Sequence, residues 1–117
     1  MAYYGDNVPF AWVAMTSINT ASINDSYGVS SVSRIQNGTH QINFSAGPGN
    51  SSYCCVGENG CQRDTWADGD DGNDQIQIVL NRSNSSYRIG GCDLDDGLQG
   101  DSKFIFSACY STTKPAT

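Results

Sequence analysis

Residues Asn24–Phe44 read NDSYGVSSVSRIQNGTHQINF, and this stretch decides the fold. Side chains of an extended chain point alternately to opposite faces, so Val29–Ile35 and His40–Phe44 form two period-two runs. Asn37-Gly38 separates the runs, and both residues tolerate the positive φ angles of a tight primed turn. The stretch therefore predicts a β-hairpin that turns at these two residues.

Composition extends the β assignment to the whole chain. The 117 residues fit one domain, in which folding buries roughly 65% of the surface that the unfolded chain exposes. The hydrophobic share is 38%, glycine occurs 13 times, and Ser, Asn and Thr are abundant, whereas blocks of strong helix formers are missing. We expect an all-β domain.

Further period-two runs predict more strands on both sides of the hairpin. Ile76, Ile78 and Leu80 are expected to face inward in their run, and residues 17–25 form either a loop or a polar strand. Short strands with closely spaced turns indicate a sandwich or closed barrel. We expect an antiparallel β-sandwich, jelly-roll or immunoglobulin-like, over 9–111, with an N-terminal arm at 1–8 and a tail at 112–117. The other predicted strands are Pro9–Thr16, Tyr53–Gly57, Gln75–Leu80, Tyr87–Ile89 and Lys103–Tyr110.

Aromatic residues divide into two groups by sequence context. Four lie in the apolar runs and are predicted to be core residues, namely Trp12, Phe44, Phe104 and Phe106. Three lie in the polar lead or in an acidic loop, where exposed Tyr and Trp favour a subunit interface or a sugar-stacking surface. These candidate interface residues are Tyr3, Tyr4 and Trp66.

Charge excludes two classes of partner. The chain has 12 acidic and 6 basic residues, a formal net charge of -6, which repels a phosphate backbone. No run approaches the ~20 apolar residues of a spanning helix, and no basic amphipathic stretch suits an anionic bilayer. We expect neither nucleic acid nor membrane as a partner. The first residues lack a signal-peptide pattern, so secretion by that route is not expected.

Cysteines and acidic loops raise the question of metals. Five cysteines, an odd number, favour buried thiols, with disulfides formed after release from the cell as an alternative. Zinc is disfavoured because Cys55 and Cys61 are widely spaced and because Cys54 and Cys55 face opposite sides of a strand. Calcium suits the oxygens of one acidic loop, although a solvated loop is the preferred interpretation and no cofactor is expected. The loop's carboxylates belong to Asp68, Asp70, Asp71 and Asp74.

Catalysis finds little support in the sequence. His40 is the single histidine, and it lies in an alternating run beside a turn. A nucleophile, a base and an orienting group must converge in space for acyl transfer, and no motif selects a Ser or Cys for this task. We predict no catalytic residues.

Several segments together resemble a small β-rich domain of bacteriophage tail-fibre and other virion surface proteins. That family opens on Ala-Trp-Val, as in Ala11–Val13, and continues through a serine-rich strand similar to Asp25–Val32. A Gly-Thr turn and a strand ending in Asn-Phe follow, as in Gly38–Phe44. Tyr53–Gly57 and Lys103–Tyr110 are similar to two later strands of the family.

The resemblance implies a structural role in the virion, assembled in the host cytoplasm. Fibre tips and head-decoration proteins commonly sit on threefold positions, so the resemblance implies a homotrimer. We expect a capsid cement or decoration protein that binds the major capsid protein, or another virion protein, on the outer head surface. A tail-fibre tip that binds host saccharide or receptor is the alternative, and a secreted hydrolase or lectin is a third possibility.

Overall fold

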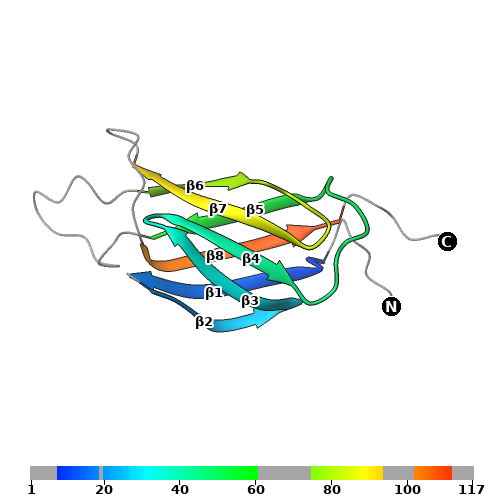
Figure 1. Ribbon diagram of the computed structural model, residues 1–117, viewed down its shortest axis with the longest axis horizontal. Coiled ribbons are helices and arrows are strands. Elements are labelled where there is room, and N and C mark those ends of the chain that lie inside the picture. The colour runs from blue at the N-terminus through cyan, green and yellow to red at the C-terminus, as the bar shows by residue number, and fades with distance from the viewer. Residues whose placement is uncertain (1–7, 19, 61–74, 94–101, 112–117) are drawn as a thin grey trace, which may run out of the picture.

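The computed structural model describes residues 8–18, 20–60, 75–93 and 102–111, and these residues form an all-β structure without helices (Figure 1). In this part of the chain there is accordingly no helix of the length and apolarity that crossing a membrane requires. Eight strands follow one another along the chain: β1 (Ala11–Ile18), β2 (Thr20–Tyr27), β3 (Val29–Gln36), β4 (Thr39–Phe44), β5 (Cys54–Asn59), β6 (Gln75–Leu80), β7 (Ser86–Asp93) and β8 (Ser102–Tyr110).

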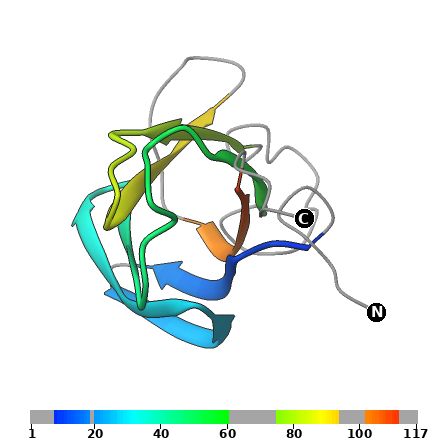
Figure 2. The ribbon, with the colours of Figure 1, turned by 90° about the vertical axis from the view of Figure 1, so that its right-hand side faces the viewer.

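The strands form two four-stranded sheets, and every pairing is antiparallel. Sheet A has the order β2-β1-β8-β5, and sheet B has the order β3-β4-β7-β6. Seen along the strands, the two sheets face each other (Figure 2), and buried side chains fill the space between them. β3 adjoins β2 along one side of the molecule, and β6 adjoins β5 along the other. The predicted all-β, antiparallel, sandwich-like architecture is confirmed.

The hairpin formed by β3 and β4 is also confirmed, although its turn differs from the expected type. Gln36 pairs with Thr39, so Asn37 and Gly38 are the two turn residues. Gly38 has a φ of 79°, but Asn37 does not adopt a positive φ, which a type I′ turn requires at both positions. The pairing of β3 with β4 accommodates this turn by a register shift between Arg34 and Gln36.

Gly28 is the point at which the chain passes from sheet A to sheet B. Its φ is 72°, and a Cβ placed there would lie 2.5 Å from the carbonyl oxygen of Phe10. Only glycine permits both the left-handed backbone and this close approach. The Gly28 carbonyl then accepts a hydrogen bond of 2.9 Å from Ser45 N–H, which fixes the end of β4 beside the crossing.

The core combines an aromatic cluster with an aliphatic layer. Phe10, Phe44, Tyr53 and Tyr87 contact one another, with ring centroids 5.1 to 6.2 Å apart in mostly edge-to-face geometry. Inward-facing aliphatic and sulfur-containing side chains of both sheets fill the rest of the interior. They are Ala11, Val13, Met15, Ile42, Ile89, Ile105 and Cys109.

The predicted orientation of β6 is wrong. Ile76, Ile78 and Leu80 are exposed, whereas Gln77 and Val79 are partly buried. Pairing with β7 determines this facing, because Val79 lies opposite a fully buried residue, Ile89. The polar segment before the hairpin, which the sequence left open, forms β2.

The core assignment is correct for Phe44 and wrong for the other three aromatics. Ile105 and Ser107 point inward from β8 and are fully buried. Phe104 and Phe106 alternate with them along the strand and therefore point outward. Trp12 likewise alternates with inward neighbours on β1 and is only partly buried on the outer face. The interior of the sandwich is therefore filled by smaller side chains than the sequence predicted.

Candidate functional surface

The outer face of sheet A carries a row of apolar side chains across all four strands. Trp12 on β1 lies opposite Tyr27 on β2 and, on its other side, opposite Ala108 on β8. Ala108 in turn lies opposite Val56 on β5. The ring of Phe106 stacks on Trp12 at a centroid distance of 6.4 Å and an interplanar angle of 29°. We name Trp12, Tyr27, Val56 and Phe106 the aromatic face.

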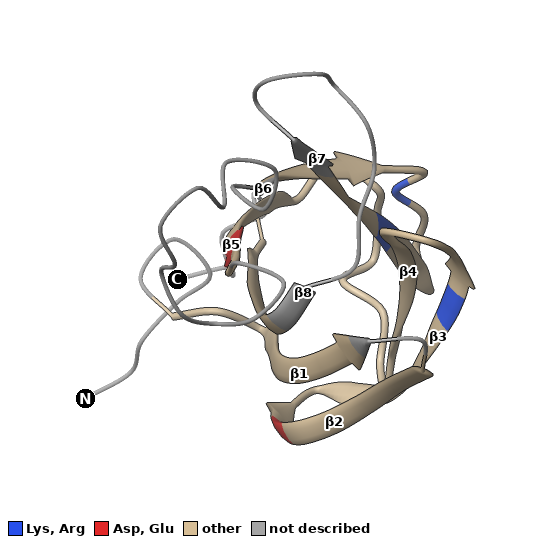
Figure 3. Cartoon of the chain, turned by 90° about the vertical axis from the view of Figure 1, so that its left-hand side faces the viewer, with Lys and Arg blue, Asp and Glu red and all other residues tan. Residues whose placement is uncertain are grey.

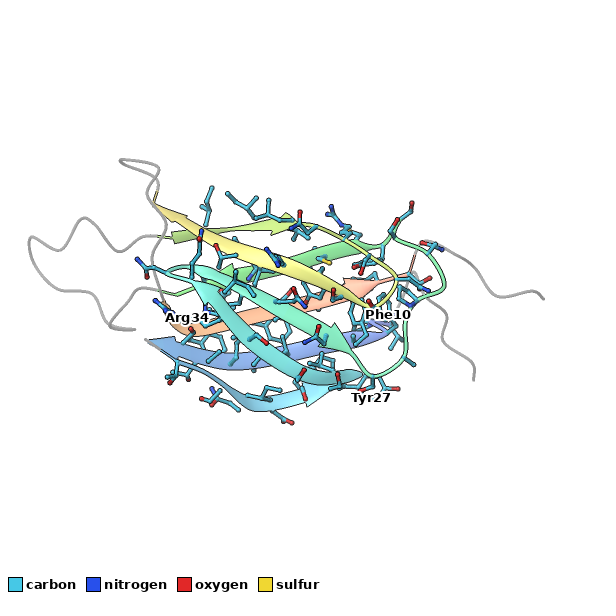
Figure 4. All side chains as sticks on the ribbon, viewed as in Figure 1. Phe10, Tyr27 and Arg34 are labelled. Atoms are coloured by element: carbon cyan, nitrogen blue, oxygen red, sulfur yellow. The ribbon has the colours of Figure 1, made fainter. Side chains whose placement is uncertain are left out.

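The aromatic face is open to solvent in the single chain. Tyr27 is 60% exposed and Val56 is 49% exposed, at opposite edges of the sheet. Tyr27 lies near the end of β2 along the lower edge of the molecule in Figure 4. Contiguous apolar side chains on the surface of a soluble protein mark an interaction site, and aromatic residues are enriched in such sites.

An exposed aliphatic strip continues this surface around one side of the sandwich. It consists of Ile76, Ile78 and Leu80, which share the outer face of β6. β6 adjoins β5, so the strip lies beside the edge that carries Val56. Together they extend the apolar surface from sheet A onto the edge strand of sheet B.

The rest of the outer face of sheet B has the opposite character. Gln41 donates from Nε2 to Asn43 Oδ1 at 3.0 Å, and Asn43 donates from Nδ2 to Ser31 Oγ at 3.0 Å. Arg88 donates from Nε to Gln41 Oε1 at 3.2 Å. These amide, hydroxyl and guanidinium groups bind one another across β3, β4 and β7, so the surface of this sheet is polar where the surface of sheet A is apolar.

The described charged side chains follow the same division (Figure 3). Asp25 on β2 and Glu58 on β5 lie on sheet A. Arg34 on β3 and Arg88 on β7 lie on sheet B, and Arg82 lies in the turn that joins β6 to β7. Arg34 marks the end of the sandwich opposite to Phe10 in Figure 4. Among the side chains that the structure describes, sheet A therefore carries two carboxylates and sheet B two guanidinium groups.

Two buried hydrogen bonds place hydroxyl groups in the interior. The Ser17 hydroxyl on β1 contacts His40 Nε2 on β4, and the Tyr87 hydroxyl on β7 donates to Ser107 Oγ on β8 at 2.8 Å. Each contact joins sheet A to sheet B. Ser17 and His40 are 0% and 1% exposed, so a substrate cannot reach this hydroxyl in the folded chain, and the contact acts as a polar tie between the sheets.

A third tie lies at the seam between β5 and β6. Gln77 Nε2 donates to Asn59 Oδ1 at 2.8 Å and to the carbonyl oxygen of Phe106 at 3.0 Å. Gly57 makes room for it, because a Cβ there would lie 2.5 Å from Gln77 Oε1. The glutamine that the sequence placed outward thus connects the edge strands of the two sheets.

The described thiols are Cys54, Cys55 and Cys109. Cys54 is exposed and Cys55 points inward, as predicted from their adjacent positions on a strand. Cys55 and Cys109 lie opposite each other on β5 and β8, with their Sγ atoms 3.0 Å apart. Within the described part of the chain, no three His, Cys, Asp or Glu side chains gather as they would around a metal ion.

The remaining predicted site residues lie outside the described residues. They are the interface candidates Tyr3, Tyr4 and Trp66 and the calcium candidates Asp68, Asp70, Asp71 and Asp74. The aromatic face was missed because period-two alternation separates two sides of a strand without saying which side faces the core. One signal could have identified it. On their two strands the bulky side chains, Trp12 and Phe106, lie on one face and more compact side chains lie on the other.

The chain matches no protein-family model, no curated protein and no solved structure in comparisons of its sequence and fold.

Proposed function

We propose that this protein is a structural component of a bacteriophage virion. In this proposal it is a capsid decoration protein that binds the outer surface of the head as a homotrimer and stabilises the lattice of the major capsid protein. The single observation that carries the proposal is the aromatic face, an exposed apolar surface on one sheet of a small sandwich. The sequence resemblance to virion surface domains supplies the biological setting.

Burial of the aromatic face supplies the driving force for association. Removing apolar surface from water contributes roughly 25 cal/mol per Å², and large aromatic side chains dominate such interfaces. Val56 and Tyr27 lie at the two edges of sheet A, so a partner that covers both must cover the whole sheet. It would also lie over β2 and β5, the edge strands of sheet A, and so hinder their pairing with other chains.

The difference between the two sheets supports a ring of copies, and the number three comes from the resemblance to virion surface domains. A contact that joins two different surfaces is heterologous, and repeated heterologous contacts close into a ring when the rotation permits. In this arrangement the carboxylates of Asp25 and Glu58 on sheet A would face guanidinium groups of sheet B such as that of Arg88. Complementary charges steer copies into this orientation and disfavour the contact of sheet A with itself.

The order of the strands supports a Greek-key sandwich as the proposed fold. Around the molecule the strands follow the order β1-β2-β3-β4-β7-β6-β5-β8, with β2 beside β3 and β6 beside β5. In this order β8 returns to lie beside β5, and β4 lies beside β7. Both are Greek-key relationships.

In the proposed function, binding shifts the assembly equilibrium toward the capsid lattice. A protein that binds the assembled lattice, and not free capsid subunits, stabilises the lattice by mass action, by about 2.7 kcal/mol per site at one hundred times the dissociation constant. This role requires binding surfaces and solubility but no cofactor.

Two measurements test the proposal. Light scattering during size-exclusion chromatography should give the mass of three chains. Empty heads of the phage should bind the protein at a fixed ratio to the capsid subunit and resist heat or denaturant better when it is bound. A monomer at all concentrations, together with heads that neither bind nor gain stability, would reject the proposal.

The tail-fibre tip is retained as the second candidate because of one observation. Tyr27, beside Trp12 on an exposed face, is a side chain of the kind on which sugar rings stack. In that case the isolated protein binds host cells, free surface polysaccharide competes for this binding, and heads are not bound. Binding to heads without binding to cells supports the decoration protein.

A further inference from the structure

The arrangement of Cys55 and Cys109 is unusual among the described thiols because the two sulfurs already touch. Cys55 lies on the edge strand β5 and Cys109 on the central strand β8, in direct register. Their Sγ atoms are 3.0 Å apart, and a disulfide needs an approach of only about 1 Å more. Cys109 is fully buried, whereas Cys55 is partly exposed.

Backbone hydrogen bonds show that the pair has the spacing that a cross-strand disulfide requires. Gly60 N–H donates to the carbonyl of Phe104, which continues the β5–β8 register by one position, so 60 and 104 form a hydrogen-bonded pair. Such pairs alternate with non-hydrogen-bonded pairs along an antiparallel ladder. Cys55 lies five positions before residue 60, and five is an odd number. Cys55 and Cys109 are therefore a non-hydrogen-bonded pair.

The carbonyl group of Cys109 agrees with this count. It accepts a hydrogen bond of 2.9 Å from Phe10 N–H, on the β1 side of β8 and away from β5. In non-hydrogen-bonded pairs the Cα atoms are about 4.5 Å apart, which lies within the range that disulfides span. Neither strand needs to move for the bond to form.

The two thiols also differ in pKa and in exposure, and this difference suits a two-step thiol–disulfide exchange. The hydrogen bond with the Cys55 thiol lowers the pKa of Cys109, and the Tyr87 hydroxyl contributes in the same direction. The same thiol–thiol hydrogen bond, together with burial, raises the pKa of Cys55. The buried sulfur is therefore the better thiolate, and the sulfur that faces the seam is the one an external reagent can meet.

We propose that Cys55 and Cys109 are a redox-active dithiol that closes to an intramolecular disulfide by exchange with a small-molecule disulfide such as oxidised glutathione. Cys55, the sulfur that an external reagent can reach, attacks one sulfur of the oxidant, gives up its proton to the departing thiol and forms a mixed disulfide, so one reduced thiol is released. The Cys109 thiolate then attacks Cys55 Sγ and releases the second. The protein loses two protons and two electrons, and the oxidant gains them as two thiols.

The bond would lock an edge strand to the centre of sheet A. It closes a long loop of chain that includes β6 and β7, and a cross-link of that span restricts the unfolded state strongly. We expect a melting temperature higher by about 10 °C in the oxidised protein. This inference concerns the chain itself and does not depend on the proposed virion function.

Two serine-substituted variants test the pairing. The first combines Cys54→Ser, Cys61→Ser and Cys92→Ser and keeps only Cys55 and Cys109. The matched control replaces Cys55 and keeps Cys54, so its two thiols lie on opposite faces of sheet A. Each is incubated with oxidised glutathione, and intact mass and thiol content are measured with and without dithiothreitol.

The first variant should lose two hydrogen atoms in mass, lose both free thiols and melt at the higher temperature, all reversibly. The control should keep its Cys109 thiol and at most acquire a glutathione adduct. The unsubstituted protein provides a test that needs no mutation, since its melting temperature should rise on oxidation and fall on reduction. The inference is overturned if Cys55 stops at the glutathione adduct, if the control forms the bond equally well, or if oxidation leaves the unsubstituted melting temperature unchanged.

Discussion

The indole of Trp12 and the ring of Phe106 stack on the outer face of sheet A, with centroids 6.4 Å apart and planes inclined by 29°. The two residues come from neighbouring strands, β1 and β8, and are diagonal neighbours, because Trp12 pairs with Ala108 and Phe106 with Ala14. The stack makes this face flat and apolar at its centre, while its edges remain exposed at Tyr27 and Val56. A flat apolar centre with exposed edges is a surface that gains free energy when another protein covers it.

Charging the aromatic face should weaken association without unfolding the chain. Val56→Lys places an ammonium group at a 49% exposed position, where the single chain tolerates it. In the trimer this charge loses its water without gaining a partner, which weakens association by about 2 kcal/mol, roughly thirty-fold. Sedimentation equilibrium measures the effect.

The matched control for this substitution is Val8→Lys. Val8 is 41% exposed and precedes β1, outside both sheets. It should associate like the unsubstituted protein. Equal weakening by both substitutions would show that the effect of Val56→Lys is not specific to the aromatic face.

Local patterns were enough to predict the strands and their class. Asn37-Gly38 between two runs located the hairpin of β3 and β4, and the last apolar run located β8, because turn chemistry and alternation act within a few residues. The polar strand β2 was left open because its residues lack apolar alternation. It forms because Tyr27 through Thr20 pair with β1, which is a long-range condition.

The same patterns could not predict which side of each strand faces the core. Both sides of β6 and of β8 carry apolar side chains, so alternation alone could not identify the buried side. The partner strand decides it: Val79 turns inward opposite Ile89, and Gln77 follows it into the seam. The sulfur pair was hidden for the same reason, since the register of Cys55 with Cys109 spans more than fifty residues and depends on β8 lying beside β5.

Removing the Ser17 hydroxyl should destabilise the sandwich. Ser17→Ala deprives His40 Nε2 of a buried partner, and such a loss costs about 1 to 3 kcal/mol in the free energy of unfolding. Ser33→Ala, at an exposed position on β3, should stay within about 0.5 kcal/mol of the parent. Urea unfolding measures both.

A double-mutant cycle attributes this cost to the contact itself. Ser17→Ala combined with His40→Leu should be less destabilised than the sum of the single changes, because removing both polar groups leaves neither one stranded. Strict additivity would mean that the hydroxyl and the imidazole do not stabilise each other.

Stability should fall in strong alkali partly because of Tyr53. Burial raises the pKa of its hydroxyl to about 12, whereas the unfolded chain has the ordinary value of about 10. Below pH 10 both states keep the proton and the stabilisation is complete. Between pH 10 and 12 the unfolded state loses the proton first, so the free energy of unfolding decreases and the contribution is lost as pH rises through the folded pKa.

Tyr53→Phe isolates this contribution. It removes the hydrogen bonds to the carbonyls of Ser83 and Ser86, so at about pH 8 the variant should be less stable by about 1 kcal/mol. The gap between the two proteins should shrink as pH rises from about 10 to 12. Burial also raises the pKa of Tyr87, but this residue is common to both proteins. A gap independent of pH would contradict the assignment.

The seam between β5 and β6 should tolerate no side chain at Gly57. In Gly57→Ala the new Cβ would lie 2.1 Å from the Phe106 carbonyl oxygen and 2.5 Å from Gln77 Oε1. The side chain of Gln77 can move away, but the backbone of β8 cannot move without disturbing the core beneath it. We expect a loss of about 2 to 3 kcal/mol in the free energy of unfolding, measured by denaturant titration.

Two further variants separate backbone crowding from the loss of the glutamine contacts. Gly90→Ala on β7 is the matched control, because its Cβ would meet only Leu80 Cδ1 at 3.8 Å and the Gly38 carbonyl oxygen at 3.9 Å, which are ordinary contacts. It should change stability by less than about 1 kcal/mol. Adding Gln77→Ala to Gly57→Ala should not restore stability, because the clash with the β8 backbone remains. Full recovery in that double variant would instead identify the glutamine as the sole obstacle and show that β5 and β8 can separate at this point.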